Sequence, residues 1–330
     1  MMRRGIRFVA LGAVVVAGLS FPGAAAVTPP QFVPRETYEA PGQLASLPDH
    51  RKLNFLCMGK GSPTVIFESG FGAGAFAWGR VQPRVAAVTR VCAYDRAGYG
   101  FSDSGPLPRD GQAIAHDLER GLAAAGIRGP YVLVAHSAGG LYARLFAARH
   151  RREVKGMVFV DSSVEHQPQR IAQLFGTTAA SMDGQRRRPA RCLEIAEGKG
   201  AAPTETERQG CLAGAGPGPA GLGLRPAIWK SQLSELDTLF EETSDQVDRT
   251  RGLLKDIPAI VLTASSVDGP PSPAADPGAA AWQSLHHDLA TRFLRSQHRL
   301  VKSGHLMMNE RPEVVAAAAI ELVEQARKKR

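Results

Sequence analysis

The fold of this chain is decided by the stretch Tyr131-Val-Leu-Val-Ala-His-Ser137-Ala-Gly-Gly-Leu-Tyr-Ala-Arg. An apolar run of strand character passes directly into a turn of small residues and then into a helical pattern. Ser137 stands at the apex of that turn. Small residues at Ala135 and Gly139 let the backbone bend sharply, so the serine hydroxyl is expected to project above the sheet edge, with the Ala138 amide pointing the same way.

Length and charge narrow the possible classes of protein. The chain has 330 residues, enough for one α/β domain with an insertion. Its formal net charge of +9 is spread along the chain. The basic cluster Arg186-Arg-Arg188 is typical of a solvated loop rather than of a nucleic-acid-binding patch. Because no zinc-ligand spacing, P-loop or Rossmann glycine pattern occurs, the sequence predicts no cofactor, no metal and no nucleic-acid partner.

The first 26 residues have the three regions of a secretory signal peptide. Residues 3–7 are basic, residues 8–19 are apolar, and small residues lead up to Ala26. We expect cleavage near Ala26 and an exported protein, periplasmic or secreted. The alternative is an uncleaved anchor, although the apolar run is shorter than the roughly 20 residues of a membrane span. No other stretch could cross a bilayer, so we expect no stable span after cleavage.

Residues 27–49 are rich in proline and polar side chains, and we interpret them as an N-terminal arm that precedes a domain beginning near His50. Apolar and β-branched runs then alternate with helical patterns. This alternation predicts an α/β fold, in which helices flank a mostly parallel central sheet on both faces. The strands are expected at residues 53–58, 64–68, 90–94, 131–135, 155–160, 259–263 and 299–302.

The interval between Val160 and Ala259 is too long, and has too little strand character, for an ordinary connection. Its amphipathic segments and a break rich in glycine, proline and alanine at residues 213–223 indicate a helical insertion. We expect residues 164–250 to form a helical cap over the strand ends. Residues 50–163 and 251–330 would then form the core.

Three further motifs accompany the turn at Ser137, and each follows a predicted strand. Together with that turn, in which Ala135 replaces the first glycine of G-x-S-x-G, they resemble the α/β-hydrolase family, and within it the esterase- and lipase-like serine hydrolases. The resemblance covers the chain from about residue 50, although Glu68 and its neighbour replace a more usual histidine. The motifs are Phe67-Glu-Ser-Gly-Phe71-Gly-Ala-Gly, Tyr94-Asp-Arg-Ala-Gly-Tyr-Gly-Phe-Ser102 and Ser303-Gly-His305.

The resemblance implies a role for each motif. Ser137 would be the nucleophile and His305 the base, because a serine hydroxyl attacks well only when an imidazole within hydrogen-bond reach takes its proton. The backbone N–H groups of Phe71 and Ala138 would form the oxyanion hole. The expected reaction is hydrolysis of a small-molecule carboxylic ester through an acyl-enzyme.

The triad acid has two candidates. Asp268 follows the strand at residues 259–263 and resembles the commonest position of the acid in the family. Asp161 ends the strand at residues 155–160 and resembles the position used by a smaller subset. We favour Asp161 because a rigid strand end carries it, whereas Asp268 lies in a loop with glycine and two prolines.

Other polar residues near the motifs are expected to have structural roles. His136 should point away from the nucleophile and support its turn, whereas His286 and His287 are interpreted as surface residues. The turn after the third strand should be held by its own side chains through bonds to its backbone. The side chains in question are Asp95, Arg96 and Ser102.

Substrate and partners are less well defined. A peptidase, lactonase or acyltransferase would carry the same triad, and a catalytically silent binding module could use the same fold. Phe71, Phe76 and Trp78 form either an apolar acyl pocket or part of the core. The cap is expected to set acyl-chain selectivity while the triad stands without it. The sequence leaves the oligomeric state open.

Four cysteines in an exported chain predict two disulfides. The strand order of the family would place Cys57 beside Cys92 on neighbouring strands. Cys192 and Cys211 would then pair within the cap, where they close a loop of about 20 residues.

Overall fold

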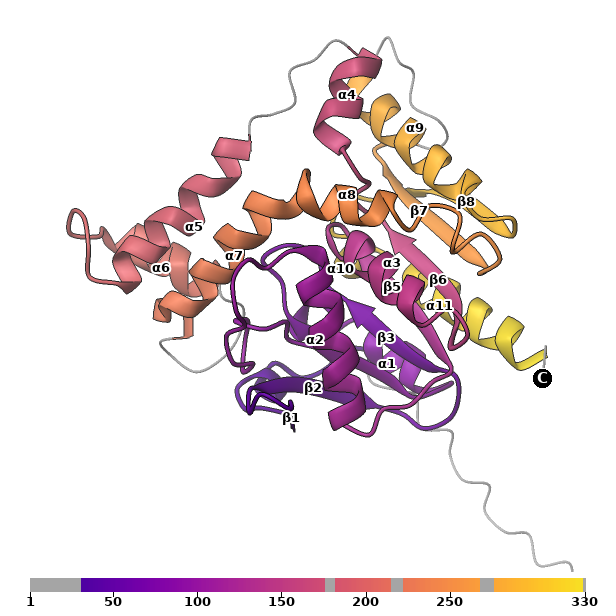
Figure 1. The fold of residues 1–330 in the computed structure, drawn as a ribbon, viewed down its shortest axis with the longest axis horizontal. Helices are drawn as coiled ribbons and strands as arrows, with labels where there is room; N and C mark the ends of the chain where they lie inside the picture. Colours follow the sequence, from indigo (N-terminus) through magenta and orange to yellow (C-terminus); the bar gives the residue numbers. More distant parts are fainter. Residues whose placement is uncertain (1–30, 176–181, 215–221, 268–275, 329–330) are drawn as a thin grey trace, which may run out of the picture.

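The computed structural model describes residues 31–175, 182–214, 222–267 and 276–328. Its centre is one eight-stranded sheet in the order β1-β2-β4-β3-β5-β6-β7-β8 (Figure 1). β2 is antiparallel to both of its neighbours, and the pairs from β4 to β8 are parallel. The strands are β1 (Gln43–Ser46), β2 (Lys52–Met58), β3 (Thr64–Glu68), β4 (Val91–Tyr94), β5 (Tyr131–His136), β6 (Val154–Val160), β7 (Ala259–Ser265) and β8 (Ser296–Lys302). The predicted α/β fold with a mostly parallel sheet is confirmed.

The sheet begins earlier than the start that we expected near His50. β1 pairs with β2, with Leu44 opposite Asn54. Only Ala45 of its four residues is buried, so the segment lacks the alternating apolar pattern by which a strand is recognised in a sequence.

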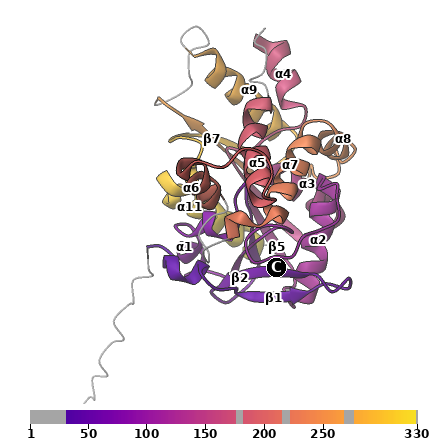
Figure 2. The same ribbon diagram turned by 90° about the vertical axis from the view of Figure 1, so that its left-hand side faces the viewer.

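Helices cover both faces of the sheet, and the side chains of β5 show how the two cores arise. Leu133 and Ala135 pack into the core beneath α2 (Gly111–Ala124), α3 (Gly139–Arg149) and α9 (Pro277–Thr291). Val132 and Val134 point to the opposite face, into the core beneath α1 (Gln82–Ala86) and α11 (Pro312–Lys328). This alternation follows from the two-residue period of a strand that is buried on both faces. In Figure 2, β1 and β2 lie at one end of the sheet, and α4 and α9 lie at the other.

Five further α-helices lie in the described part of the interval between β6 and β7. We call residues 164–250 of this interval the helical insertion. Figure 1 shows α5 and α6 projecting from the body of the molecule, with α7 between them and the sheet. Among the described helices, none has both the length and the apolar character to span a bilayer. The helices of the insertion are α4 (Gln167–Phe175), α5 (Met182–Ala196), α6 (Glu205–Gly214), α7 (Pro226–Leu239) and α8 (Glu242–Asp248).

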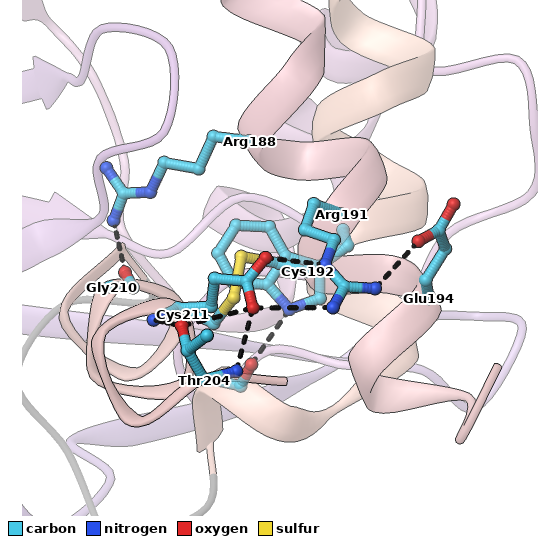
Figure 3. Close-up of a disulfide and its surroundings, with 10 residues drawn as sticks. Arg188, Arg191, Cys192, Glu194, Thr204, Gly210 and Cys211 are labelled. Atoms are coloured by element: carbon cyan, nitrogen blue, oxygen red, sulfur yellow. Dashed lines mark hydrogen bonds and ion pairs between the residues drawn. A yellow bond between two sulfur atoms is a disulfide. The ribbon is translucent and has the colours of Figure 1, made fainter. Parts of the chain in front are cut away.

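Both predicted disulfides are present in the structure. Cys57 lies directly opposite Cys92 on β2 and β4, with 4.1 Å between their Cα atoms. Cys192 and Cys211 join α5 to α6 (Figure 3). The second bridge packs with Leu222, Ile228 and Trp229, which gives the insertion a small apolar core.

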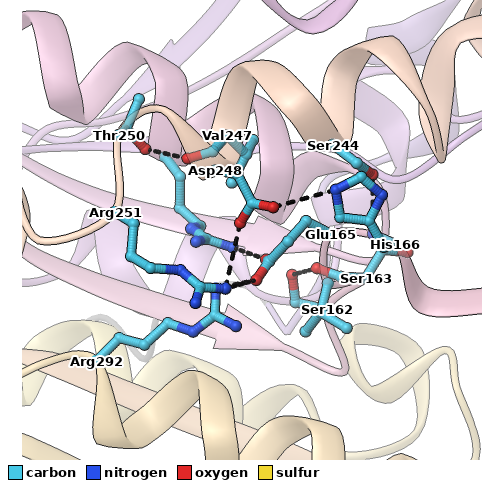
Figure 4. A network of polar contacts seen from close by, with 12 residues as sticks. Ser162, Ser163, Glu165, His166, Ser244, Val247, Asp248, Thr250, Arg251 and Arg292 are labelled. Carbon is cyan, nitrogen blue, oxygen red and sulfur yellow. Dashed lines mark hydrogen bonds and ion pairs between the residues drawn. The ribbon is translucent and has the colours of Figure 1, made fainter. Parts of the chain in front are cut away.

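A buried carboxylate joins the two ends of the insertion to the core (Figure 4). Glu165 follows β6, and its side chain is 1% exposed. Its carboxylate accepts a hydrogen bond from Arg144 of α3 at 2.6 Å and pairs with Arg251 after α8 and with Arg292 after α9. Burial alone would raise the pKa of Glu165, but Arg144 and Arg292 lower it to about 2.

Candidate active site

Ser137 lies between β5 and α3 in a left-handed backbone conformation, with φ at 51°. Its carbonyl oxygen accepts a hydrogen bond from Ser163 N at 2.9 Å, which holds the turn against the end of β6. Gly139 is required by close packing, because an added Cβ atom would lie 2.6 Å from the carbonyl oxygen of Glu68 and 2.7 Å from that of Ser69. A left-handed serine is costly, and it persists here because the surrounding backbone fixes it.

His305 lies in the loop between β8 and α10 (Met307–Glu310) and contacts Asp161 directly. The distance between His305 Nδ1 and Asp161 Oδ2 is 2.6 Å. The Asp161 side chain is 4% exposed, whereas that of His305 is 49% exposed. Glu310 fixes the histidine loop by accepting a hydrogen bond from Gly304 N at 2.7 Å.

The second carboxylate oxygen of Asp161 has its own donors. Asp161 Oδ1 accepts hydrogen bonds from Ala264 N at 2.8 Å and from Trp282 Nε1 at 2.7 Å. Burial acts to raise the pKa of Asp161, but the bond from His305, the nearby His286 and these two donors hold it below its usual value. The carboxylate is therefore ionised and fixed in orientation near neutral pH.

Asp268, the other candidate for the acid, lies outside the described residues. Of the two candidates, the described structure therefore places only Asp161, which lies beside His305.

Ser137 and His305 line one cavity of about 230 Å³. Phe71, Phe76, Leu306 and Met308 contribute its apolar lining. Trp78 is instead buried in the core, where it stacks on Phe67 with ring centroids 4.4 Å apart and donates a hydrogen bond to Ser69 Oγ.

A larger cavity of about 1140 Å³ lies at the opposite ends of the strands. Residues that precede β5 and β6, such as Arg128 and Arg152, are part of its lining. Ligand chemistry in open α/β sheets takes place at the carboxyl ends of strands, so the smaller cavity beside Ser137 is the candidate site.

The two predicted oxyanion donors come from different segments of the chain, the loop after β3 and the start of α3. Phe71 lines the cavity from the loop after β3, and Ala138 is the buried N-cap residue of α3. Gly70 must lack a side chain, because an added Cβ atom would lie 2.7 Å from His136 Nδ1. Gly72 takes a φ of 74° in the same loop.

His136 and His286, which we expected to be a structural and a surface residue, are both buried. His136 lies beside His305, and burial lowers the pKa of His136 to about 3. The neutral ring donates from Nε2 to the carbonyl oxygen of His305 at 2.9 Å, which supports the histidine loop. His286 is fully buried, so its assignment to the surface was wrong. Its Nε2 donates to the carbonyl oxygen of Ser162 at 2.7 Å.

A model of the alpha/beta hydrolase family matches residues 65–318, which is most of the chain. The chain belongs to the alpha/beta hydrolase family. Membership agrees with the sheet order and with the position of Ser137 at the turn after β5, and it supports a hydrolytic function.

Solved structures of alpha/beta hydrolases share this fold. A putative lipase from Acinetobacter baumannii is 17% identical and superposes with a TM-score of 0.62, covering 90% of this chain and 95% of the lipase. An esterase from Thermogutta terrifontis is 19% identical, with a TM-score of 0.55 and coverage of 87% of this chain and 99% of the esterase. At these identities the likeness concerns the fold.

Curated relatives match over shorter stretches. An uncharacterized protein of Schizosaccharomyces pombe is 50% identical over 82 residues, which cover 25% of this chain and 15% of the yeast protein. The matched stretches cover between 15% and 43% of the length of these curated relatives.

Three residues of the site were not recognised in the sequence as part of it. Trp282 of α9 donates to Asp161, across 121 residues of sequence. Arg96 was expected to hold its own turn, as Asp95 and Ser102 do, but its guanidinium reaches the loop after β3 and pairs with Glu235 of α7. No local pattern marks these contacts, because each joins elements that are distant in the sequence.

Proposed function

We propose that this protein is a serine hydrolase that cleaves a small carboxylic ester through an acyl-enzyme on Ser137. One observation carries the proposal: His305 Nδ1 lies 2.6 Å from the buried Asp161 carboxylate, and His305 lines the same cavity as Ser137. A carboxylate can only accept, so Nδ1 carries the hydrogen and Nε2 is left free to act as the base.

In the proposed reaction, Ser137 Oγ attacks the ester carbonyl carbon while His305 Nε2 takes the hydroxyl proton. The N–H groups of Phe71 and Ala138 stabilise the oxyanion that forms. The imidazolium of His305, stabilised by Asp161, then gives its proton to the departing alkoxide, and the alcohol leaves. Water attacks the acyl-enzyme, again losing a proton to His305, and the carboxylic acid is released as Ser137 recovers its proton.

The size of the cavity indicates which esters to expect. Its volume of about 230 Å³ lies below the range of about 300–1000 Å³ typical of drug-sized ligand sites. Its apolar lining favours an alkyl group over a charged one. We therefore propose that short acyl chains are preferred.

A series of p-nitrophenyl esters from acetate to palmitate tests this proposal. We expect the highest kcat/KM for acyl chains of a few carbons and background hydrolysis for the Ser137→Ala variant. Equal activity of the wild type and this variant toward every ester would contradict the proposed function. A maximum at palmitate would contradict only the size of the acyl group.

We also propose that the protein is exported. The basic and apolar start of the sequence supports this, and so do two disulfides, which persist mainly in oxidising compartments. N-terminal sequencing of the protein recovered outside the cytoplasm should begin just after Ala26. Recovery with an intact N-terminus and free thiols would contradict export.

A further inference from the structure

A buried arginine holds the backbone of the predicted oxyanion loop. Arg96 Nη1 donates to the carbonyl oxygen of Ser69 at 2.7 Å, and Nη2 donates to that of Gly70 at 2.9 Å. The Arg96 side chain is 2% exposed. These bonds therefore form away from solvent and fix two successive peptide groups of the loop.

The bond to Gly70 has a direct consequence for Phe71. The carbonyl of Gly70 and the N–H of Phe71 belong to the same planar peptide unit, in which the C=O and N–H groups of a trans peptide point in opposite directions. An arginine that fixes the direction of this carbonyl also fixes the direction of the Phe71 N–H. That N–H is one of the two proposed oxyanion donors.

Arg96 is itself held through every donor that it has. An arginine has five N–H groups in a rigid fork. Beyond the two carbonyls, Nη1 donates to Glu68 Oε1 at 3.1 Å, Nε donates to Glu235 Oε1 at 3.2 Å, and Nη2 donates to Glu235 Oε2 at 3.2 Å. The guanidinium thus has one position that satisfies both backbone carbonyls and both carboxylates.

The aromatic rings beside the guanidinium leave it little freedom to tilt. Its central carbon lies 4.9 Å from the centroid of the Tyr99 ring and 5.4 Å from that of Tyr142. Both tyrosines are buried. Stacking on such rings favours a cation and restricts the plane of the fork.

Glu235 brings the helical insertion into this arrangement. It lies on α7 with 1% of its side chain exposed. The same helix contacts the turn that carries Arg96: an added Cβ atom on Gly98, whose φ is 88°, would lie 2.8 Å from Ser231 Cβ. α7 is further anchored where Ser234 Oγ accepts a hydrogen bond from Arg109 N at 2.8 Å.

We propose that Arg96 and Glu235 are positioning residues through which α7 of the insertion orients the Phe71 N–H toward the oxyanion. The insertion then contributes to the rate of the chemical step as well as to substrate choice. This inference rests on the proposed function for its kinetic consequence. Its structural part, the hold of α7 on the loop at residues 69–72, is independent of any reaction.

The test uses the isosteric variant Glu235→Gln in the full chain. It removes the negative charge and turns an amide donor toward the guanidinium, so the fork loses one of its anchors. We expect kcat to fall about tenfold while KM stays within about twofold, because an oxyanion donor acts mainly in the transition state. Arg96→Lys keeps the charge but lacks the fork, so we expect a larger loss of about a hundredfold.

Thr238→Val is the matched control. Thr238 is a buried residue one turn further along α7. Its hydroxyl lies 3.0 Å from the carbonyl oxygen of Ser234, 3.3 Å from that of Glu235 and 3.4 Å from that of Arg109, so its hydrogen bonds go to backbone carbonyls and not to the guanidinium. This variant should keep wild-type kcat even where it lowers thermal stability. Equal losses of kcat in Thr238→Val and Glu235→Gln would overturn the proposal, because the effect would then be general loosening of α7.

Two further readouts separate positioning from stability. An alkyl boronic acid, whose serine adduct places an oxygen in the oxyanion hole, should lose affinity for Glu235→Gln by the same factor as kcat. A carboxylate product should bind it as tightly as it binds the wild type. Unchanged boronic acid affinity beside a reduced kcat would contradict the role assigned to Phe71.

Hydrogen–deuterium exchange tests whether α7 holds the loop at residues 69–72, and it does so without measuring catalysis. The peptide covering residues 69–76 should exchange faster in Glu235→Gln than in the wild type or in Thr238→Val. Unchanged exchange would overturn the inference. If the wild type hydrolyses no ester, the proposed function fails, and this comparison still decides whether α7 holds the loop. Arg96→Lys serves for the same comparison should Glu235→Gln not fold.

Discussion

Trp282 is the residue whose contribution to the site can be measured most cleanly. Its Nε1 is one of two donors to Asp161 Oδ1, at 2.7 Å. A hydrogen bond to a charged acceptor is worth about 1.5–3 kcal/mol, so its loss should loosen the orientation of the carboxylate and, through it, of His305. We expect Trp282→Phe to lower kcat about tenfold with little change in KM.

Titration of the Asp161 carboxyl gives this prediction a second readout. Donation from Trp282 is one cause of the lowered pKa of Asp161, so the substitution raises that pKa toward its usual value. A carbon-13 NMR titration of this carboxyl should therefore show it losing its proton at a higher pH in Trp282→Phe than in the wild type. Trp229→Phe is the control, because the Nε1 of Trp229 also donates a hydrogen bond, but to the carbonyl oxygen of Gly223 within the insertion. A fall of kcat in that variant too would contradict a specific role for Trp282.

Single residues of the site differ in how far the sequence reveals them. Ser137 and His305 stand in local patterns, each directly after a strand, so both could be proposed from the sequence. The acid was left between Asp161 and Asp268, because the choice depends on which carboxylate lies beside the imidazole. Trp282 could not be predicted, since its bond to Asp161 spans two elements and depends on how α9 packs beside β7.

At the scale of elements, two buried carboxylates join strand ends to helices and differ in their electrostatics. Glu165 is surrounded by several arginines, which lower its pKa. Glu68 at the end of β3 shares one arginine with Glu235, so the group has two carboxylates for one cation. Burial accordingly raises the pKa of Glu68 to about 7, even though Arg96 and Tyr94 donate to it.

This raised pKa predicts an unusual dependence of stability on pH. The unfolded chain loses the Glu68 proton near pH 4.5 and the folded chain near pH 7, so ionisation in the unfolded state makes folding less favourable as pH rises between these values. Glu68→Gln removes this titration. The free energy of unfolding of Glu68→Gln minus that of the wild type should therefore increase by on the order of 3 kcal/mol between pH 4.5 and pH 8, because only the wild type loses this stability. Urea unfolding at both pH values measures it, and a constant difference would contradict the raised pKa.

Elements were predictable where their apolar patterns were strong. Seven strands were located to within a few residues, because strands that are buried on both faces, such as β5 and β6, are mostly apolar. β1 was missed because its short edge pairing buries one alanine. The helical character of the insertion was expected, but the seating of α7 on the turn at Gly98 depends on packing that no sequence window contains.

At the scale of the whole molecule, the insertion is tied to the core at more than its ends. Glu165 near its start pairs with Arg251 directly after its end. Glu235 pairs with Arg96, whose guanidinium donates to the loop beside the cavity. We had expected the triad to stand without residues 164–250. The contact between Arg96 and Glu235 changes that expectation. A deletion that removes α7 also removes Glu235, one of the two carboxylates that hold the Arg96 guanidinium. It should therefore slow acylation of Ser137 as well as alter substrate preference.

The central claim is that Ser137, His305 and Asp161 form one nucleophilic unit. The most direct measurement is the rate at which a fluorophosphonate phosphonylates the folded protein, followed by intact mass and peptide mapping. We predict one adduct on Ser137 in the wild type, none in His305→Ala, and labelling slowed by several orders of magnitude in Asp161→Asn. An unlabelled wild type would contradict the claim and favour a silent binding module, and wild-type labelling of Asp161→Asn would contradict Asp161 as the acid.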